Sequence, residues 1–471
     1  MARRRIPLTV EAGLLVLPVL LFPLLLFGFS SREERFVPGE PPARTLQLVI
    51  ASPQWEGIKF EFEEGFRRWL YEKRRLGVEV RWIDVGGGAT TLRWIQEQFR
   101  QRPDGIDVDL FFGGGTDPYD TLKEAGLLQR YEPDPDILRG VPERVGGFPI
   151  LDPDRFWFGT ALTGFGIMVN SEVIRWVDGL KGVEVKGWDD LADPRLRGWV
   201  GAADPRGSSS FHTLYEILLQ VRGFEQGLRL IRLMGANVAA YSRFSAEVPK
   251  LCAVGQVACS MTIDHYARAQ IDQVGPAIRF VLPEGETLVN ADAVAILKGA
   301  GNQEAARLFV DFLLSDEAGR LWMLRKGEPG GPVRHPLNRA CVRPGLYELV
   351  EGRSNVRVNP FRMRFSFRYD YPRAALRWNL LNDLLGALVI DTRAELRAAV
   401  EAYQQLEGAA KARAGELLFE NPVTEQEALE MAALEWKSDE SFRERKKIEW
   451  RRFAGERYAA VADLLVEERE E

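Results

Sequence analysis

The sequence predicts an α/β fold with a largely parallel sheet, preceded by an apolar N-terminal segment and followed by a helical extension. Three patterns support this prediction. Strand-like runs alternate with helical spacing after residue 44, an uncharged apolar run lies near the N-terminus, and leucines recur at helical spacing after residue 372. Alternating strands and helices are typical of layered α/β domains. A hydrophobic content of 46% and a charged content of 28% are ordinary for a globular protein.

The predicted strands and helices alternate along the first part of the chain. We expect strands at 44–50, 78–85 and 108–112, with helices at 57–71 and 91–100 between them. In sheets of this kind, ligands bind at the carboxyl ends of the strands, against helix N-termini. The residues that directly follow each strand are therefore the first candidates for a binding site.

The N-terminus carries a candidate membrane segment, which we place at 1–30 with its apolar run at 12–29. As a helix, that run would be about 27 Å long, close to the hydrocarbon thickness of roughly 30 Å. Arg3, Arg4 and Arg5 precede it and favour an orientation with the bulk of the chain on the periplasmic or extracellular side. Because no A-x-A site follows the run, the sequence favours an uncleaved, single-pass signal anchor over a cleaved signal peptide.

Composition limits the remaining possibilities. Residues 31–43 are polar and rich in proline, which is typical of a linker. The net charge of −6 argues against a nucleic-acid surface, so we expect no nucleic-acid partner. Cys252, Cys259 and Cys341 are too few for a disulfide framework, and we expect buried free thiols.

Three strand ends carry residues suited to ligand binding. Glycines allow backbone N–H groups to approach a ligand closely, and serines at a helix start offer hydroxyls and free N–H groups to an anionic oxygen. A tight turn or a helix cap without a ligand is the alternative at each place. The candidates at these strand ends are Gln54, Trp55, Gly114, Gly115, Thr116, Ser208, Ser209 and Ser210.

Three phrases, in this order, resemble bacterial extracellular solute-binding proteins, the receptors of ABC importers. They are GWDDLADP at 187–194, DPRGS at 204–208, and the strand-turn-helix stretch LVNADAVAIL to LLSDEAGRLW at 288–322. The resemblance extends from residue 44 to about residue 350 and points to the iron(III)- and polyamine-type cluster of that family. It implies a receptor that binds a small ligand, hands it to an ABC importer permease and performs no chemistry.

The resemblance also implies the domain organisation. The fold would be a two-lobed clamshell, with the first lobe at 44–160 and 290–350 and the second at 161–289. Crossover strands would act as a hinge around a ligand held between the lobes. Residues 351–471 lie beyond the usual end of such a receptor and form the C-terminal extension.

Two classes of ligand stay open. In the iron(III)-binding branch of the family, adjacent tyrosines ligate the metal, and the corresponding positions here are Asp264, His265 and Tyr266. Phenolate and imidazole suit a ferric ion, so His265 and Tyr266 are the candidate metal ligands, although the tyrosine pair is missing. An organic ligand is the alternative. Asp264 would pair with an amine, the serines would hold a carboxylate or phosphate, and Trp55, Tyr241 and Tyr266 would stack on it.

Other functional classes have little support in the sequence. There is no Walker A loop, no G-x-S-x-G elbow and no H-E-x-x-H zinc spacing, so we expect no catalytic residues and no enzyme. An exported enzyme stays as a minor alternative. A tethered sensor or assembly subunit that uses the receptor fold is the stronger alternative, because it would explain the anchor and the extension.

The extension is expected to be helical and to pack on the receptor body. Residues 360–372 alternate basic and aromatic side chains and predict a packed strap or strand. Thr392 with Glu395 and Thr424 with Glu427 have the spacing of capping boxes. Residues 437–457 are densely charged and predict a solvated helix.

Overall fold

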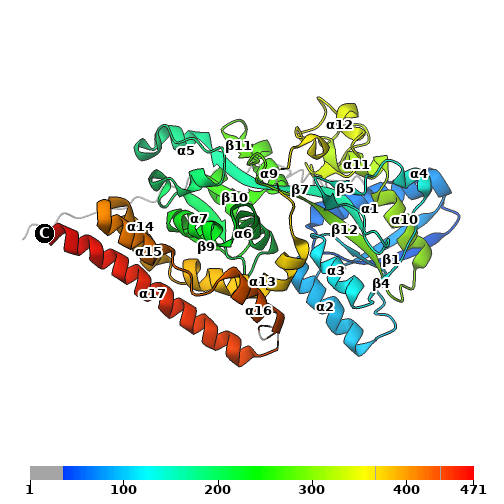
Figure 1. Ribbon diagram of the computed structural model, residues 1–471. Helices are drawn as coiled ribbons and strands as arrows, with labels where there is room; N and C mark the ends of the chain where they lie inside the picture. Colours follow the sequence, from blue (N-terminus) through cyan, green and yellow to red (C-terminus); the bar gives the residue numbers. More distant parts are fainter. Residues whose placement is uncertain (1–35, 366, 435, 437, 471) are drawn as a thin grey trace, which may run out of the picture. The chain divides into compact units, whose positions relative to one another are not determined.

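One long strand, β7 (Phe158–Asn170), is shared by two half-sheets. Every residue of β7 is buried, which is typical of a strand covered on both faces. Its first part pairs antiparallel with β12 (Val289–Leu297) and β13 (Ala340–Cys341). Its second part pairs antiparallel with β10 (Cys259–Ile263) and β11 (Ile278–Val281). The two half-sheets form two lobes joined at β7 (Figure 1).

Lobe 1 is built on a mixed half-sheet. Parallel strands β2, β1 and β3 lie side by side, and β12 closes this group antiparallel to β3. The helix α1 buries an aromatic face on the sheet, where Phe62 and Phe66 contact rings from α10 and α11. Besides β12 and β13, the strands of lobe 1 are β1 (Thr45–Ala51), β2 (Gly77–Ile83), β3 (Leu110–Phe112), β4 (Leu128–Gln129), β5 (Arg144–Val145) and β6 (Phe148–Pro149), and its helices are α1 (Glu56–Arg74), α2 (Gly88–Gln101), α3 (Asp117–Glu124), α4 (Pro135–Leu138), α10 (Gln303–Leu313), α11 (Asp316–Met323) and α12 (Leu346–Leu349).

Lobe 2 continues the sheet on the other side of β7. Strand β10 lies next to β7, and β8 and β9 follow in parallel. Helix α6 follows β8 after the short loop 204–208, and α9 starts directly after β10, so their N-termini lie near carboxyl ends of strands. The remaining strands of lobe 2 are β8 (Val200–Ala203) and β9 (Val238–Ser242), and its helices are α5 (Ser171–Trp176), α6 (Ser209–Arg222), α7 (Phe224–Asn237), α8 (Val248–Ala253) and α9 (Asp264–Val274).

This computed structural model describes residues 36–365, 367–434, 436 and 438–470. The predicted signal anchor at 12–29 lies outside these residues. Within the part of the chain that is described, no helix is both long enough and apolar enough to cross a membrane. All three cysteines are buried free thiols, as the sequence predicted.

The C-terminal extension packs on lobe 2 and shares its hydrophobic core. Helix α13 lies against α6, and α14 lies between α7 and α17 (Figure 1). A five-residue π-helical turn, Gly386–Ile390, follows α13. The helices of the extension are α13 (Tyr371–Leu385), α14 (Arg393–Gln405), α15 (Gly408–Phe419), α16 (Glu425–Leu434) and α17 (Glu440–Glu470).

Two predictions about the extension need correction. The region 437–457 is not only a solvated helix, because α17 buries Trp450, Ala454 and Tyr458 at helical spacing against the body. The proposed capping box at Thr392 does not form, since the Thr392 hydroxyl donates to the carbonyl of Ala387 instead. The second capping box is confirmed.

That second box is reciprocal, as the spacing predicted. The backbone N–H of Thr424 donates to the Glu427 carboxylate at 2.8 Å, and the Glu427 N–H donates to the Thr424 hydroxyl at 3.3 Å.

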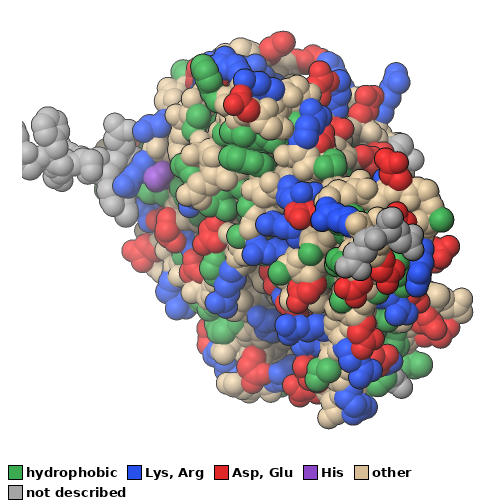
Figure 2. Space-filling model, turned by 90° about the vertical axis from the view of Figure 1, so that its left-hand side faces the viewer, with side chains coloured by type: hydrophobic (Ala, Val, Ile, Leu, Met, Phe, Trp, Pro, Cys, Tyr) green, Lys and Arg blue, Asp and Glu red, His purple; other side chains and the backbone are tan. Residues whose placement is uncertain are grey.

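Figure 2 shows basic and acidic side chains interspersed over one face of the molecule, which is typical of a solvent-exposed surface.

Candidate functional site

Two polar residues interrupt the apolar pattern of β12 and meet the loops of lobe 1. Asn290 and Asp292 are half-buried, and they are two residues apart and so point to the same face of the strand. The Thr116 hydroxyl lies 3.4 Å from Asn290 Oδ1, and Gln54 Nε2 donates to Asp292 Oδ2 at 3.3 Å. A Cβ on Gly115 would lie 2.8 Å from Asn290 Nδ2, so a side chain at position 115 would displace the Asn290 amide.

A buried arginine lies beside this group. Arg339 Nη2 lies 2.6 Å from Asp292 Oδ2 and 2.6 Å from the Thr163 hydroxyl, with 1% of its side chain exposed. Its guanidinium also lies 5.1 Å from the centre of the Trp322 ring. Asp292 is thus held between Gln54 of lobe 1 and the buried cation, which fixes the orientation of its carboxylate.

The N-terminus of α9 supplies the facing groups from lobe 2. Arg268 Nη2 lies 3.6 Å from Asp264 Oδ2, and His265 Nδ1 lies 3.7 Å from Asp264 Oδ1. The His265 and Tyr266 rings lie 4.4 Å apart. We call Gln54, Thr116, Asp264, His265, Arg268, Asp292 and Arg339 the interlobe site, because they come from both lobes and from β12.

The protonation states in the interlobe site follow from burial and the two arginines. Burial lowers the pKa of His265, and the positive charge of Arg339 lowers it further. Burial by itself would raise the pKa of Asp264, but His265, Arg268 and Arg339 together lower it. Burial raises the pKa of Tyr266. At neutral pH the site therefore holds an ionised Asp264, a neutral imidazole and a neutral phenol.

Four buried polar atoms of the interlobe site have no hydrogen-bond partner among the described residues. They are Asp264 Oδ1, His265 Nδ1, Arg268 Nε and Arg339 Nε. Buried polar atoms in folded proteins almost always have a hydrogen-bond partner. Asp264 Oδ1 and His265 Nδ1 lie 3.7 Å from each other, beyond hydrogen-bond distance. All four atoms can therefore bond to a bound molecule or to ordered water, and both acceptor and donor atoms are among them.

The structure divides the residues predicted from sequence into two groups. In the first group, Gln54, Gly115 and Thr116 contact β12. The negative charge of Asp292 in β12 acts to raise the pKa of both His265 and Tyr266. The lobe 1 loops and the N-terminus of α9, with Asp264, therefore lie close together. Gly114 lies in the same loop with a φ of +85° and open space beside its α-carbon. Trp55 is 48% exposed and packs edge-on against His335 at 5.3 Å.

The second group lies next to the C-terminal extension. Ser208 is buried and caps α6, accepting from the Phe211 N–H at 3.4 Å, and the Ser209 carbonyl accepts from the Thr213 hydroxyl. Ser210 occupies the same first turn of α6. The adjacent Arg206 forms an ion pair with Asp391 at 2.8 Å. This loop therefore has partners in the extension.

Tyr241 belongs with this second group. Burial raises its pKa, and the positive charges of Arg393 and Arg397 from α14 act in the opposite direction. Both arginines donate to backbone carbonyls of lobe 2 near Tyr241, Arg393 to Ala239 at 2.5 Å and Arg397 to Val238 at 2.7 Å. Tyr241 thus faces the extension.

The residues present give little support to a metal. Among the described residues, no group of three or more His, Cys, Asp or Glu side chains is placed to hold a metal ion. The candidate ligands His265 and Tyr266 both lie in the positive field of Arg339. A buried guanidinium repels a cation, and a neutral phenol is a poor ligand for a ferric ion.

The sequence did not predict four residues that form or adjoin the interlobe site. Asn290 and Asp292 had a local signal, since they are polar residues inside an apolar strand. Arg268 had a weaker one, because it lies four residues after Asp264 on the same helix face. Arg339 had none, because its position depends on the antiparallel pairing of β13 with β7.

A family model and curated relatives match this chain. The model of bacterial extracellular solute-binding proteins matches residues 108–343. A protein of Haemophilus influenzae described as uncharacterized is 29% identical over 247 residues, which cover 52% of this chain and 67% of the relative. The phosphoglycerate transport regulatory protein PgtC of Salmonella typhimurium is 24% identical over 228 residues, covering 46% of this chain and 55% of that relative. The chain thus aligns with little more than half of PgtC.

Solved structures share the fold. The periplasmic binding protein AfuA of Actinobacillus pleuropneumoniae, with fructose-6-phosphate bound, has a TM-score of 0.55 and 21% identity, covering 75% of this chain and 97% of AfuA. Iron-bound HitA of Pseudomonas aeruginosa has a TM-score of 0.54 and 18% identity, covering 72% of this chain and 99% of HitA. These similarities confirm the two-lobed fold predicted from the sequence.

Proposed function

Because the chain belongs to the family of bacterial extracellular solute-binding proteins, we propose that it binds a small polar organic solute at the interlobe site and delivers it to an ABC importer permease. The four unpartnered buried atoms carry this proposal. They come from α9 of lobe 2 and from Arg339 at the crossover strands, so a molecule that bonds to them and to lobe 1 would favour lobe closure.

The chemistry of the site favours an organic anion that also carries hydroxyl groups. The Nε–H groups of Arg268 and Arg339 suit a phosphate or carboxylate, and Asp264 Oδ1 accepts from a hydroxyl. The two arginines are offset by Asp264 and Asp292, so the site as a whole is close to electrically balanced. The name of PgtC refers to phosphoglycerate, and the AfuA structure has fructose-6-phosphate bound, so both compounds are suitable probes.

A ferric ion is the less favoured cargo. The tyrosine pair of the iron-binding branch is missing, the pKa of Tyr266 is raised, and Arg339 adds positive charge next to the candidate ligands. HitA has iron bound, but its 18% identity supports only a shared fold. For Tyr266 to bind iron as a phenolate it would have to lose its proton, and its burial makes that loss less favourable by raising its pKa.

Native mass spectrometry with elemental analysis of the full chain, purified in detergent, tests the ligand class. We expect an organic mass and no stoichiometric iron. Protein freed of ligand is then titrated by calorimetry with fructose-6-phosphate, 3-phosphoglycerate and ferric citrate. Stoichiometric iron would contradict the proposal, and so would the absence of both a bound mass and binding of either phosphorylated probe.

Two single substitutions test whether the ligand binds at the interlobe site or at the loop 204–210, which contacts the extension. Asp264→Asn removes a charge-assisted acceptor and is expected to weaken binding of the retained organic solute about 10- to 100-fold. Ser208→Ala removes a helix cap, which costs about 1 kcal/mol of stability, and leaves the affinity unchanged. Calorimetric titration and thermal melts measure both quantities. A large loss of affinity in the Ser208 variant would move the site to α6.

A tethered sensor or assembly subunit is the second candidate. The extension that packs on lobe 2 and the name of PgtC, a transport regulatory protein, favour it. Anchoring through 12–29 belongs to both proposals. Cross-linking in membranes discriminates between them, since a receptor would capture a permease and a sensor would capture a signalling partner. Turnover of the bound compound would instead support the exported enzyme.

A further inference from the structure

The segment between α12 and α13 runs from lobe 1 to lobe 2 outside the sheet. We call its described residues, 351–365 and 367–370, the strap; Figure 1 shows them in yellow to orange as the chain passes β7 on its way to α13. Near its start, the Ser354 hydroxyl donates to the Met323 carbonyl of lobe 1 at 2.6 Å. Near its end, the Asp370 N–H donates to Gln220 of α6 in lobe 2 at 2.7 Å. The strap is thus attached to both lobes.

A hairpin of lobe 1 packs one aromatic side chain against rings of the strap and of the first residue of α13. The hairpin β5–β6 turns at Gly146, and Phe148 directly follows the turn. Phe148 is 2% exposed, and its ring lies 6.2 Å from Phe365, 6.0 Å from Tyr369 and 5.7 Å from Tyr371. Such pairs stabilise a contact beyond the area they bury. Phe148 is therefore the lobe 1 half of an aromatic cluster.

The turn of the hairpin is shaped for this contact. Gly146 has a φ of +53°, and a Cβ at that position would overlap the Phe365 ring. Phe365 also forms an isolated parallel bridge with Gly285, in the segment that leads from β11 into β12. One strap residue thus contacts both the hairpin of lobe 1 and the connection that leaves lobe 2.

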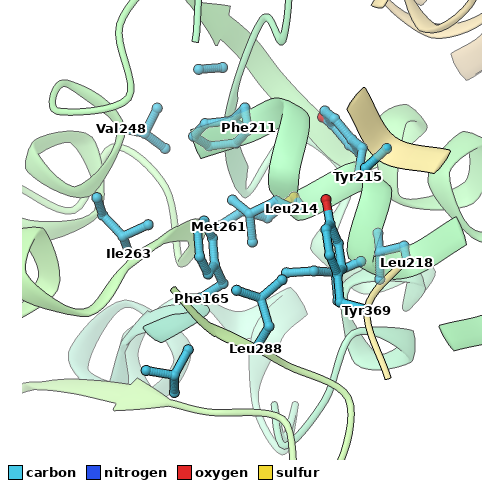
Figure 3. Close-up of a cluster of buried hydrophobic side chains, with 14 of the residues drawn as sticks. Phe165, Phe211, Leu214, Tyr215, Leu218, Val248, Met261, Ile263, Leu288 and Tyr369 are labelled. Carbon is cyan, nitrogen blue, oxygen red and sulfur yellow. The ribbon is translucent and has the colours of Figure 1, made fainter. Parts of the chain in front are cut away.

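The other half of the cluster is fixed in lobe 2. Figure 3 shows Tyr369 among Leu214 and Leu218 of α6, Phe165 of β7 and Leu288, which directly precedes β12. Beyond Tyr371, helix α13 is tied to α6 by buried polar contacts. The rings of the strap and of Tyr371, the first residue of α13, therefore move with lobe 2, while Phe148 moves with lobe 1.

From these contacts we infer that the strap is an intramolecular clasp, in which Phe148 must leave the rings of Phe365, Tyr369 and Tyr371 before the two lobes separate. This inference rests on the proposed function in one respect, since lobe separation matters only in a protein that exchanges a ligand. Without the clasp, the ligand alone would decide between the open and closed states. With it, closure is stabilised in the absence of ligand.

The clasp also contacts the interlobe site. The carbonyl of Asn355 accepts from Arg268 Nη1 at 3.0 Å, and the Asn355 side chain contacts Arg325 of lobe 1 at 3.0 Å and Asp272 of α9 at 2.9 Å. Arg268 therefore connects the strap to the residues proposed to hold the solute. Binding at the site and closure of the clasp favour the same arrangement of Arg268.

Distances between spin labels on the two lobes test the clasp without any ligand. The native cysteines are buried, so labels at Glu97→Cys in α2 and Gln226→Cys in α7 report lobe separation in the full chain. By double electron–electron resonance, the ligand-free parent is expected to give one narrow distance distribution. Phe148→Ala is expected to add a longer distance and to raise the open-to-closed ratio about tenfold or more.

A second clasp variant and a control variant are measured in the same way. Phe365 is half-buried, so Phe365→Ala tests the same contact in a protein that folds even where Phe148→Ala does not. Phe99→Ala removes a buried ring of α2 in a separate part of lobe 1 and controls for general destabilisation. Unchanged distances in the Phe148 or Phe365 variant, or an equal change in the Phe99 variant, would overturn the clasp. Because no ligand is present, this result is independent of the binding titrations.

Discussion

Arg377→Met is expected to lower the free energy of unfolding by about 3 to 5 kcal/mol, the cost of breaking a buried ion pair. Arg377 in α13 lies 2.7 Å from Glu216 in α6, and the two side chains are 1% and 0% exposed. Arg377 also reaches Glu425 of α16 at 2.6 Å. The substitution leaves the Glu216 carboxylate buried without its cation, and urea denaturation measures the loss.

Two companion variants test whether the cost comes from the uncompensated charge. The double variant Glu216→Leu with Arg377→Met removes both charges and is expected to recover much of the stability, because well-packed apolar residues often replace a buried pair at little cost. Arg362→Met breaks the ion pair with Glu348, in which both side chains are 70% exposed, and is expected to change little. Equal effects of Arg377→Met and Arg362→Met would contradict this interpretation.

The buried pair also shows that the extension is part of lobe 2. Arg232 of α7 is 1% exposed, and it donates to Asn421 at 2.9 Å and to the Glu420 carbonyl at 3.0 Å, both in the extension. His212 of α6 stacks on Trp378 at 3.5 Å and bonds to Asn382 at 2.8 Å. Truncation would leave these buried groups unpaired, so point variants on the surface of the extension are the better probes of partner recruitment.

Local periodicity predicted the order of strands and helices, because each element is defined by residues close in sequence. The expected strand at 44–50 is β1 (Thr45–Ala51), and the expected helix at 91–100 is α2 (Gly88–Gln101). The capping role of Ser208 was also predictable, since a cap needs only the following turn. The lobe boundaries at residues 160 and 290 stay a prediction, because β7 runs continuously through both half-sheets.

The interlobe site was less predictable because its contacts join distant segments. The sequence placed Gln54, Thr116 and Asp264 at strand ends, where topology brings them near each other. It could not show that Arg206, in the loop at 204–210, would pair with Asp391 of the extension, because the two residues are 185 positions apart in the chain. A glycine at 386 permits this contact, since a Cβ there would lie 2.7 Å from Arg206 Nη1.

Asp117→Asn is expected to stabilise the protein above neutral pH and to have little effect near pH 4. Burial raises the pKa of Asp117 to about 7, and the negative charges of Asp120 and of Glu216 in lobe 2 contribute. In the unfolded chain an aspartate titrates near 3.9. The folded state therefore holds a proton that the unfolded state has lost, and stability falls as the pH rises from about 4 to about 7.

The expected gain in stability follows from the size of the Asp117 pKa shift. Each pKa unit corresponds to about 1.4 kcal/mol, and because the side chain is half-buried we expect a gain of about 2 to 3 kcal/mol in Asp117→Asn at pH 8. Urea denaturation of both proteins at pH 4, 6 and 8 measures it, with the exposed Asp104→Asn as a control. A constant difference across this range would mean that Asp117 ionises normally.

The same carboxylate lies near the clasp. Burial raises the pKa of Tyr371, and the negative charges of Asp117 and Asp120 raise it further, so ionisation of Asp117 places a charge beside the clasp. The labelled parent should therefore show more open lobes at pH 8 than at pH 5, and Asp117→Asn should remove that difference.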